Sequence, residues 1–208
     1  MSTIETAAPH RAGLSSGGPL PLGAIGTRAS GWWGAWFLMI SEASLFAYLF
    51  FSYFYFSIQP PANWVPGGPP NFLYPGIQTA LVLLGCASAW YAHRSILLNE
   101  RFFAALGLGA TLLLCSAFIA VQFIDWFSKP FSFSLSTYSS EYYLITGTHL
   151  AHVVVGWLML MMTLLWTMLG YFDGVRCIPI AIVKIYWYFV AIVWIGVFFT
   201  LTCTPYFF

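Results

Sequence analysis

Five long apolar stretches, separated by short polar or proline-rich segments, dominate the chain. They cover approximately residues 32–56, 72–92, 102–126, 142–168 and 185–205. Each has roughly 20 residues or more, enough for an α-helix to cross the ~30 Å hydrocarbon core of a bilayer. The stretches are apolar on all sides and lack the alternation of β-barrel strands. The pattern predicts an all-α integral membrane protein, with five transmembrane helices in one domain over residues 31–208.

The first 30 residues have a different composition, rich in glycine, proline, serine and alanine. No apolar run follows a basic start in this segment, so it does not read as a signal peptide. We expect residues 1–30 to form a flexible cytoplasmic tail.

Composition supports the membrane assignment. The chain of 208 residues is 60% hydrophobic and only 6% charged, with a net charge of +1. A soluble domain is typically about 25% charged, so a soluble enzyme is excluded. The small net charge also excludes a nucleic-acid binder.

Basic residues in the connecting segments predict the orientation. Six lie on one side of the predicted membrane, whereas Lys129 alone lies on the other. By the positive-inside rule, the N-terminus lies inside and the C-terminus outside. The six are Arg11, Arg28, Arg94, Arg101, Arg176 and Lys184.

Ionisable residues inside the predicted helices are the main candidates for function, because burying such a group in a membrane is costly. Glu42 lies about ten residues into the first stretch, roughly 15 Å deep. His149 and His152 lie at a similar depth in the fourth stretch and share a helical face. We hypothesise that Glu42 forms a hydrogen bond with one of the histidines. The pair would either lock two helices together or serve a proton-linked or lipid-linked role.

Metal or cofactor binding by this chain is not predicted. His149, His152 and Glu42 could supply three zinc ligands, but histidines that pack helices together are commoner. The cysteines form no C-x-x-C motif, which disfavours a disulfide or thiolate site. No serine-hydrolase, metalloprotease, phosphate-loop or dinucleotide motif occurs, so the chain has no catalytic constellation of its own.

The remaining charged residues lie near helix ends. The Ser-Ser-Glu segment at 139–141 looks like the capped start of the fourth helix. Asp125 and Lys129 would form an outer rim pair or a solvated edge. Arg94 and Arg101 are typical of topology signals and contacts to lipid headgroups.

Several of these residues lie in motifs that resemble subunit III of haem–copper terminal oxidases. The segment ISEASLFAYLFFSYF resembles that family's helix with a buried glutamate, here Glu42. Four further matches follow in the family's order. The first is the W-x-A-H-R-S segment, which contains His93, and the second is Gln122 followed by the Asp125-Trp dipeptide. The third is the T-G-T-H-x-x-H motif, which contains His149 and His152. The fourth is Y-W-Y-F-V-A-I-V-W at residues 186–194.

The resemblance implies an accessory subunit without redox cofactors. Such a subunit packs on catalytic subunit I, which carries the haem and copper, and encloses structural phospholipid in a cleft between helix groups. It protects the catalytic subunit and is proposed to support proton uptake. The five-helix form implies a multi-pass protein of the bacterial inner membrane. The electron donor, cytochrome c or quinol, stays open.

Three positions depart from the family's pattern. Tyr188 and Ala191 stand where the family usually has histidine and aspartate, and Trp166 lies near a position that is often basic. The polar network of the fifth helix is therefore expected to be reduced.

Two alternatives remain open at this point. The five-helix form also resembles accessory subunits of nitric oxide reductases. A stand-alone transporter using Glu42 as a proton relay is a different class, but proline residues cluster in loops rather than breaking the helices.

Overall fold

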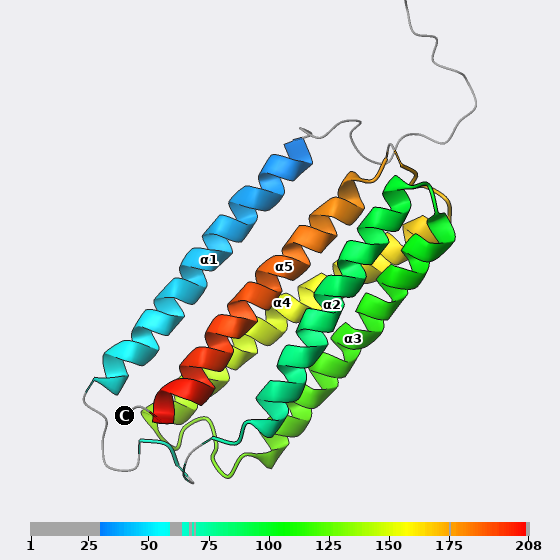
Figure 1. The fold of residues 1–208 in the computed structure, drawn as a ribbon. Helices are drawn as coiled ribbons and strands as arrows, with labels where there is room; N and C mark the ends of the chain where they lie inside the picture. Colours follow the sequence, from blue (N-terminus) through cyan, green and yellow to red (C-terminus); the bar gives the residue numbers. More distant parts are fainter. Residues whose placement is uncertain (1–29, 59–63, 67, 69, 175, 207–208) are drawn as a thin grey trace, which may run out of the picture.

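Five long helices and no strands make up the described part of the chain (Figure 1). The computed structural model describes residues 30–58, 64–66, 68, 70–174 and 176–206. All five helices are long and apolar enough to cross a membrane, which confirms the predicted fold class. The tail expected at 1–30 lies, except for Ser30, outside the described residues. The helices are α1 (Ser30–Ser57), α2 (Leu73–Leu97), α3 (Arg101–Ser128), α4 (Thr137–Met168) and α5 (Ile178–Phe198).

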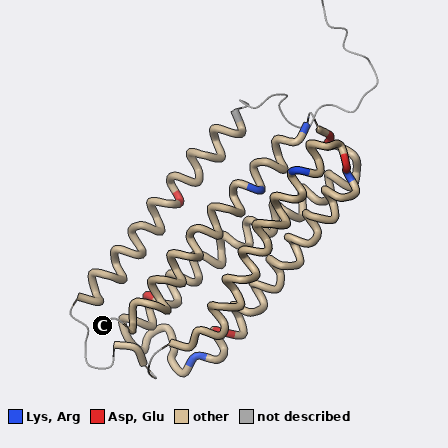
Figure 2. The backbone as a smooth tube through the Cα atoms, viewed as in Figure 1, with Lys and Arg blue, Asp and Glu red and all other residues tan. Residues whose placement is uncertain are grey.

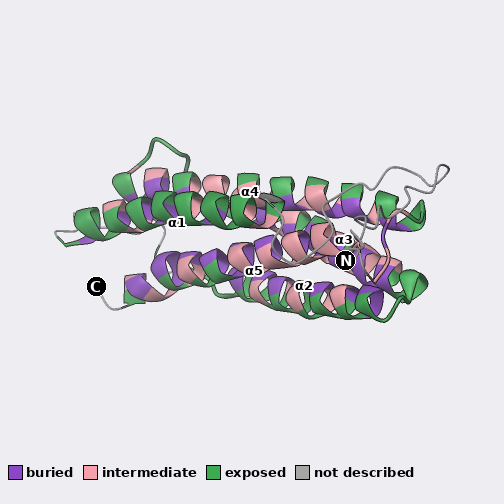
Figure 3. Cartoon of the chain, turned by 90° about the horizontal axis from the view of Figure 1, so that it is seen from above, coloured by how far each residue is buried: buried purple, intermediate pink, exposed green. Residues whose placement is uncertain are grey.

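Helices α2 to α5 form a four-helix bundle, and α1 packs on its side. Helix α2 contacts α3 and α5, α4 contacts the same two helices, and α1 contacts α4 and α5. In the most apolar window of each helix, 22% of the residues of α1 are buried, against 50% for the span that includes α5. The outer surface of α1 is correspondingly exposed along its length (Figure 3). Helix α5 is therefore central, whereas α1 presents much apolar surface to its surroundings.

Hydrogen bonds at the start of α4 begin this helix earlier than the expected residue, Tyr142. Ser136 is the N-cap: its hydroxyl accepts from the Ser139 backbone N–H at 3.1 Å. The Ser139 hydroxyl in turn accepts from the Ser136 N–H at 2.8 Å, which completes a reciprocal cap. Glu141, expected to help cap this helix, instead lies in its second turn and contacts α1.

Helices α2 and α4 end on the same side of the bundle, which we call the inner end after the predicted orientation, the opposite side being the outer end. Both helices are closed there by the same backbone motif. After α2, Asn99 adopts a positive φ of 64°, and the Glu100 N–H donates to the Ser95 carbonyl at 3.0 Å. After α4, Gly170 has a φ of 81°, and the Tyr171 N–H donates to Trp166. Both are Schellman endings, for which a left-handed residue is needed. Helix α2 thus continues past the expected end at residue 92.

Helix α5 also begins earlier than expected, at Ile178, with Pro179 in its first turn where the missing N–H is harmless. Lys184, assigned from the sequence to the preceding loop, therefore lies inside α5. The helix continues at its outer end as a wider π-helical turn, Phe199–Cys203, and a short 3-10 turn, Thr204–Tyr206.

Small residues let neighbouring helices approach closely. A Cβ on Gly107 of α3 would lie 2.9 Å from the Ala92 Cβ of α2. A Cβ on Gly85 of α2 would lie 2.7 Å from the Trp187 ring nitrogen of α5. Close contact of this kind supplies the packing energy that apolar burial cannot supply in lipid.

Charged residues lie mainly at the two ends of the bundle (Figure 2). Four of the basic residues in the described ranges lie near one end, and Lys129 lies near the other. The placement agrees with the charge pattern used for orientation, while the direction across the membrane stays a prediction.

Candidate functional site

Glu42 and His152 join α1 to α4 inside the membrane-spanning part of the bundle. Glu42 Oε2 lies 3.0 Å from His152 Nε2. The other ring nitrogen, Nδ1, lies 2.8 Å from the Thr148 carbonyl oxygen, which can only accept, so Nδ1 carries a proton. The second proton of this pair is shared between Nε2 and Oε2, giving either an imidazolium with a carboxylate or an imidazole with a carboxylic acid. Either arrangement supplies a hydrogen bond between α1 and α4.

The pair is partly accessible rather than sealed. The side chain of Glu42 is 30% exposed and that of His152 is 14% exposed. The Phe46 ring packs against the His152 ring, with centroids 5.0 Å apart. The carboxylate therefore lies at the surface of the bundle rather than in its core.

His149 lies one turn away from His152 but takes part in a different contact. It is fully buried, and its Nε2 donates to the Val190 carbonyl of α5 at 3.1 Å. Its ring packs against Phe118 and Trp194. The three predicted residues are thus divided: Glu42 pairs with His152, and His149 ties α4 to α5.

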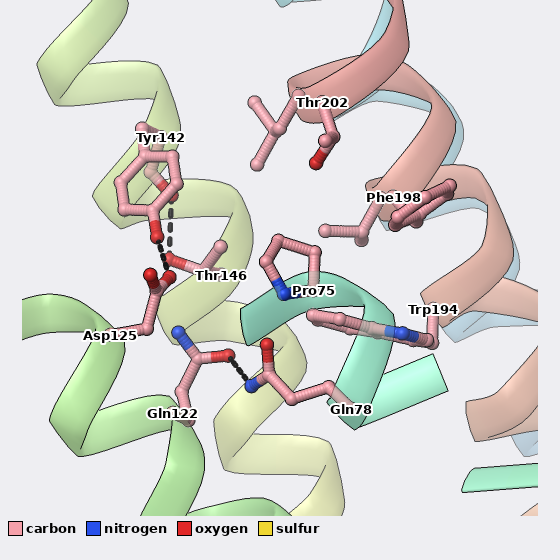
Figure 4. A pocket seen from close by; sticks show the side chains of 11 residues that line it. Pro75, Gln78, Gln122, Asp125, Tyr142, Thr146, Trp194, Phe198 and Thr202 are labelled. Carbon is pink, nitrogen blue, oxygen red and sulfur yellow. Dashed lines mark hydrogen bonds between the residues drawn. The ribbon is translucent and has the colours of Figure 1, made fainter. Parts of the chain in front are cut away.

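A second polar cluster lies near the outer ends of α2, α3 and α4 (Figure 4). Gln78 of α2 donates through Nε2 to Gln122 Oε1 of α3 at 2.8 Å. The Tyr142 hydroxyl of α4 donates to the Asp125 carboxylate. Lys129 Nζ lies 3.0 Å from the same carboxylate, whose side chain is only 3% exposed. Asp125 and Lys129 therefore form the expected pair rather than a solvated edge, but the Asp125 side chain is buried.

Sequence reasoning missed two members of this cluster. Gln78 is a lone amide within an apolar helix, and that isolation was a usable signal. Tyr142 gave no such signal, because tyrosine is common at membrane interfaces.

Glu141 makes a second carboxylate contact between α4 and α1. It is 6% exposed, and its Oε1 accepts from the Ser52 hydroxyl at 2.7 Å. Farther out, the Tyr53 and Thr204 hydroxyls lie 3.0 Å apart. Polar contacts thus hold α1 against the rest of the bundle at three positions along its length, one of which is the Glu42–His152 pair.

The residues predicted at the inner end lie apart from both clusters. His93 Nδ1 accepts from Lys184 Nζ at 3.2 Å, joining α2 to α5. The Arg94 guanidinium lies over the Trp90 ring, 5.5 Å from its centroid. Arg101 lies at one end of an apolar groove of about 540 Å³ between α3 and α4.

Metal-ligating residues do not gather within the described ranges: no group of three or more histidine, cysteine, aspartate or glutamate residues there could hold an ion. The four cysteines are free thiols, at Cys86, Cys115, Cys177 and Cys203.

Comparison with known proteins places the chain in a family. The family model described as "Cytochrome c oxidase subunit III" matches residues 27–206. Three curated relatives, all called cytochrome c oxidase subunit 3, come from Drosophila yakuba, Petromyzon marinus and Arabidopsis thaliana.

The Drosophila relative is 29% identical over 176 residues, 81% of this chain and 67% of its own length. The lamprey relative is 31% identical over 170 residues, which are 78% of this chain and 65% of the relative. The plant relative is 30% identical over 167 residues, which are 77% of this chain and 63% of the relative. The chain therefore spans about two thirds of the length of these relatives. Since the matched residues include all five helices and both polar clusters, the chain belongs to the cytochrome c oxidase subunit III family, the multi-pass membrane subunits of respiratory oxidases.

Proposed function

We propose that this chain is the accessory, cofactor-free subunit III of a bacterial haem–copper respiratory oxidase, which reduces oxygen through catalytic subunit I. It lies in the cell membrane with its N-terminus in the cytoplasm. It stabilises the catalytic subunit and supports proton uptake. The observation that carries the proposal is the family match over residues 27–206. The haem and copper belong to the partner.

The exposed face of α1 supports a role in assembly. Aromatic side chains project from it along more than two helical turns, including Tyr48, which is 68% exposed, Phe51 and Tyr55. Aromatic residues are enriched at protein interfaces and carry large apolar area. We assign this face to contact with another oxidase subunit or with lipid.

The Glu42–His152 pair supports the role in proton uptake. A proton can be shared between its partly exposed carboxylate and the imidazole, deep in a helix that packs on the edge of the bundle. Ionisable groups at such depth are typical of proton pathways. The pair would act as a local proton reservoir for the catalytic subunit.

The groove between α3 and α4 supports the binding of structural phospholipid. Its lining is mainly apolar and includes the small residues Ala105 and Gly109, and Arg101 lies at its inner end. This arrangement suits an acyl chain along the groove and a headgroup phosphate at the guanidinium. We assign the groove to a phospholipid of the surrounding membrane.

The proton role is tested by replacing Glu42 with glutamine, E42Q, in the assembled oxidase. Glutamine keeps a hydrogen-bonding side chain opposite His152 but cannot bind the exchangeable proton. We therefore expect normal assembly, lower oxygen consumption per haem and faster inactivation during turnover. Haem content and oxygen consumption measure the two quantities separately.

Two variants serve as controls. E141Q makes the same change at the other carboxylate between α4 and α1 and should leave turnover per haem unchanged. E42L removes the hydrogen bond, worth ~0.6 kcal/mol on average inside a membrane, and should lower assembly as well. Normal turnover in E42Q, with reduced assembly only in E42L, would show that the pair is a structural clamp.

The lipid assignment predicts that R101Q and G109L lower the amount of phospholipid that copurifies with the oxidase. R101Q removes the phosphate contact, and G109L fills the groove at a position where a Cβ meets no atom within 4 Å. G147L is the matched control, since Gly147 of α4 is equally open and lies outside the groove. Quantitative lipid mass spectrometry checks the result, and unchanged lipid in both variants would refute the assignment.

A further inference from the structure

Two buried amides near the outer end of the bundle have hydrogen-bonding atoms without partners. Gln78 and Gln122 are 0% and 1% exposed. Their mutual hydrogen bond uses Gln78 Nε2 and Gln122 Oε1. It leaves Gln78 Oε1, an acceptor, and Gln122 Nε2, a donor, with no partner among the described residues. Such groups are rare in folded proteins and usually mark bound solvent.

Both amides line the same small cavity. It lies between α2, α3, α4 and the outer end of α5, and the centre of a water molecule has about 10 Å³ to occupy in it. A single buried water needs roughly 10–15 Å³ by this measure, together with two to four polar partners. The cavity therefore has the size of one molecule of water.

Further polar groups surround this space. Figure 4 shows the two amides on one side of the pocket, the Asp125 carboxylate and the Tyr142 hydroxyl on another, and the Thr202 hydroxyl directed toward it from above. Thr202 comes from the π-helical turn that ends α5. A molecule between these groups could donate to Gln78 Oε1, accept from Gln122 Nε2 and make a third bond to Asp125 or Thr202.

The charge balance favours a neutral occupant. Among the described residues that line the pocket, Asp125 is the one charged residue, and Lys129 Nζ pairs with it at 3.0 Å. The Tyr142 hydroxyl also donates to this carboxylate. Within the described lining, the negative charge of Asp125 is therefore balanced and does not favour a cation.

We propose that this pocket is a hydration site that holds one water molecule, bound by Gln78 and Gln122 and by Asp125 or Thr202. The water links α2 and α3 to the outer end of the chain and completes the hydrogen bonding of the cluster. This proposal is independent of the proposed function, since it concerns a contact within the chain.

A structure of the purified full chain or its complex, at a resolution that shows ordered solvent, tests the site directly. We expect a density peak about 3 Å from both Gln78 Oε1 and Gln122 Nε2. An empty pocket with the two amides doubly bonded to each other would overturn the proposal. So would a peak with contacts of roughly 2.0–2.6 Å to oxygens, which would indicate a metal ion.

Filling the pocket gives an independent test. Val197 is 1% exposed and lines the cavity, so V197I adds one methyl group beside the water. Displacing the water leaves Gln78 Oε1 and Gln122 Nε2 unpaired, and we expect the melting temperature of the full chain in detergent to fall.

The same substitution in a Q78L/Q122L background separates this effect from crowding. Without the amides there is no bound water to lose, so V197I should lower the melting temperature much less. An equal fall in both backgrounds would indicate overpacking and contradict the hydration site, and a rise in the parent would indicate a dry cavity. If Q78L/Q122L does not fold, the density experiment decides.

Discussion

At the scale of single residues, Gly107 sets the distance between α2 and α3. A Cβ at this position would lie 2.9 Å from the Ala92 Cβ and 3.0 Å from two Ala92 backbone atoms. Backbone atoms cannot rotate away, so the helices would have to separate. The absence of a side chain at Gly107 thus permits the close contact with Ala92.

We predict that G107A destabilises the protein, whereas G109A does not. Alanine in a helix interior is favoured over glycine by about 1 kcal/mol, and at Gly109 the added Cβ meets nothing within 4 Å. At Gly107 the overpacking should cost about 1–3 kcal/mol and outweigh that gain. Thermal unfolding of the two variants in the same detergent makes the comparison, and equal stability would mean that the helices can move apart at little cost.

The sequence did not predict which of the buried polar residues pair with each other. Depth and helical spacing indicated that Glu42 could meet His149 or His152, but the choice depends on the rotation of α4. That rotation is set by packing, which buries His149 against Phe118 and Trp194 and turns His152 toward α1. No local pattern in the sequence contains this information.

At the scale of elements, local hydrogen bonds determine where a helix begins. The reciprocal cap between Ser136 and Ser139 satisfies backbone N–H groups at the start of α4. It also fixes the position of Glu141, which contacts Ser52 of α1. The cap therefore affects the contact between α4 and α1 as well as α4 itself.

We predict that S136A lowers the stability by ~1 kcal/mol, the usual effect of losing an N-cap. T137A is the matched control, because the neighbouring Thr137 is exposed. A shift of the thermal unfolding midpoint in S136A alone is the expected result, and equal effects of the two variants would assign the change to something other than the cap.

The number and type of the helices were predictable, and their ends were less so. The length of an apolar run is set by the thickness of the hydrocarbon core that the helix crosses. The ends of the helix are set instead by its last backbone hydrogen bonds, which can lie beyond the apolar run. Helix α2 therefore includes Arg94, and α5 includes Lys184, both of which can extend their charged ends toward water. Charges near a membrane boundary mark the interface rather than the helix end.

At the scale of the whole molecule, the chain is a compact bundle of α2 to α5 with α1 attached along α4 and α5. Polar contacts hold α1 at three levels, and its outer face is apolar and exposed. An exposed helix with so much aromatic surface is suited to a membrane assembly. Membership of the subunit III family places that assembly in a respiratory oxidase.

The most direct test of the account is to purify the chain from its native membrane in mild detergent and to identify what accompanies it. The proposal predicts a complex with a haem–copper catalytic subunit, a reduced-minus-oxidised haem spectrum and consumption of oxygen. A stable, colourless chain recovered alone would contradict it, and a complex that reduces nitric oxide but not oxygen would assign the chain to a nitric oxide reductase instead.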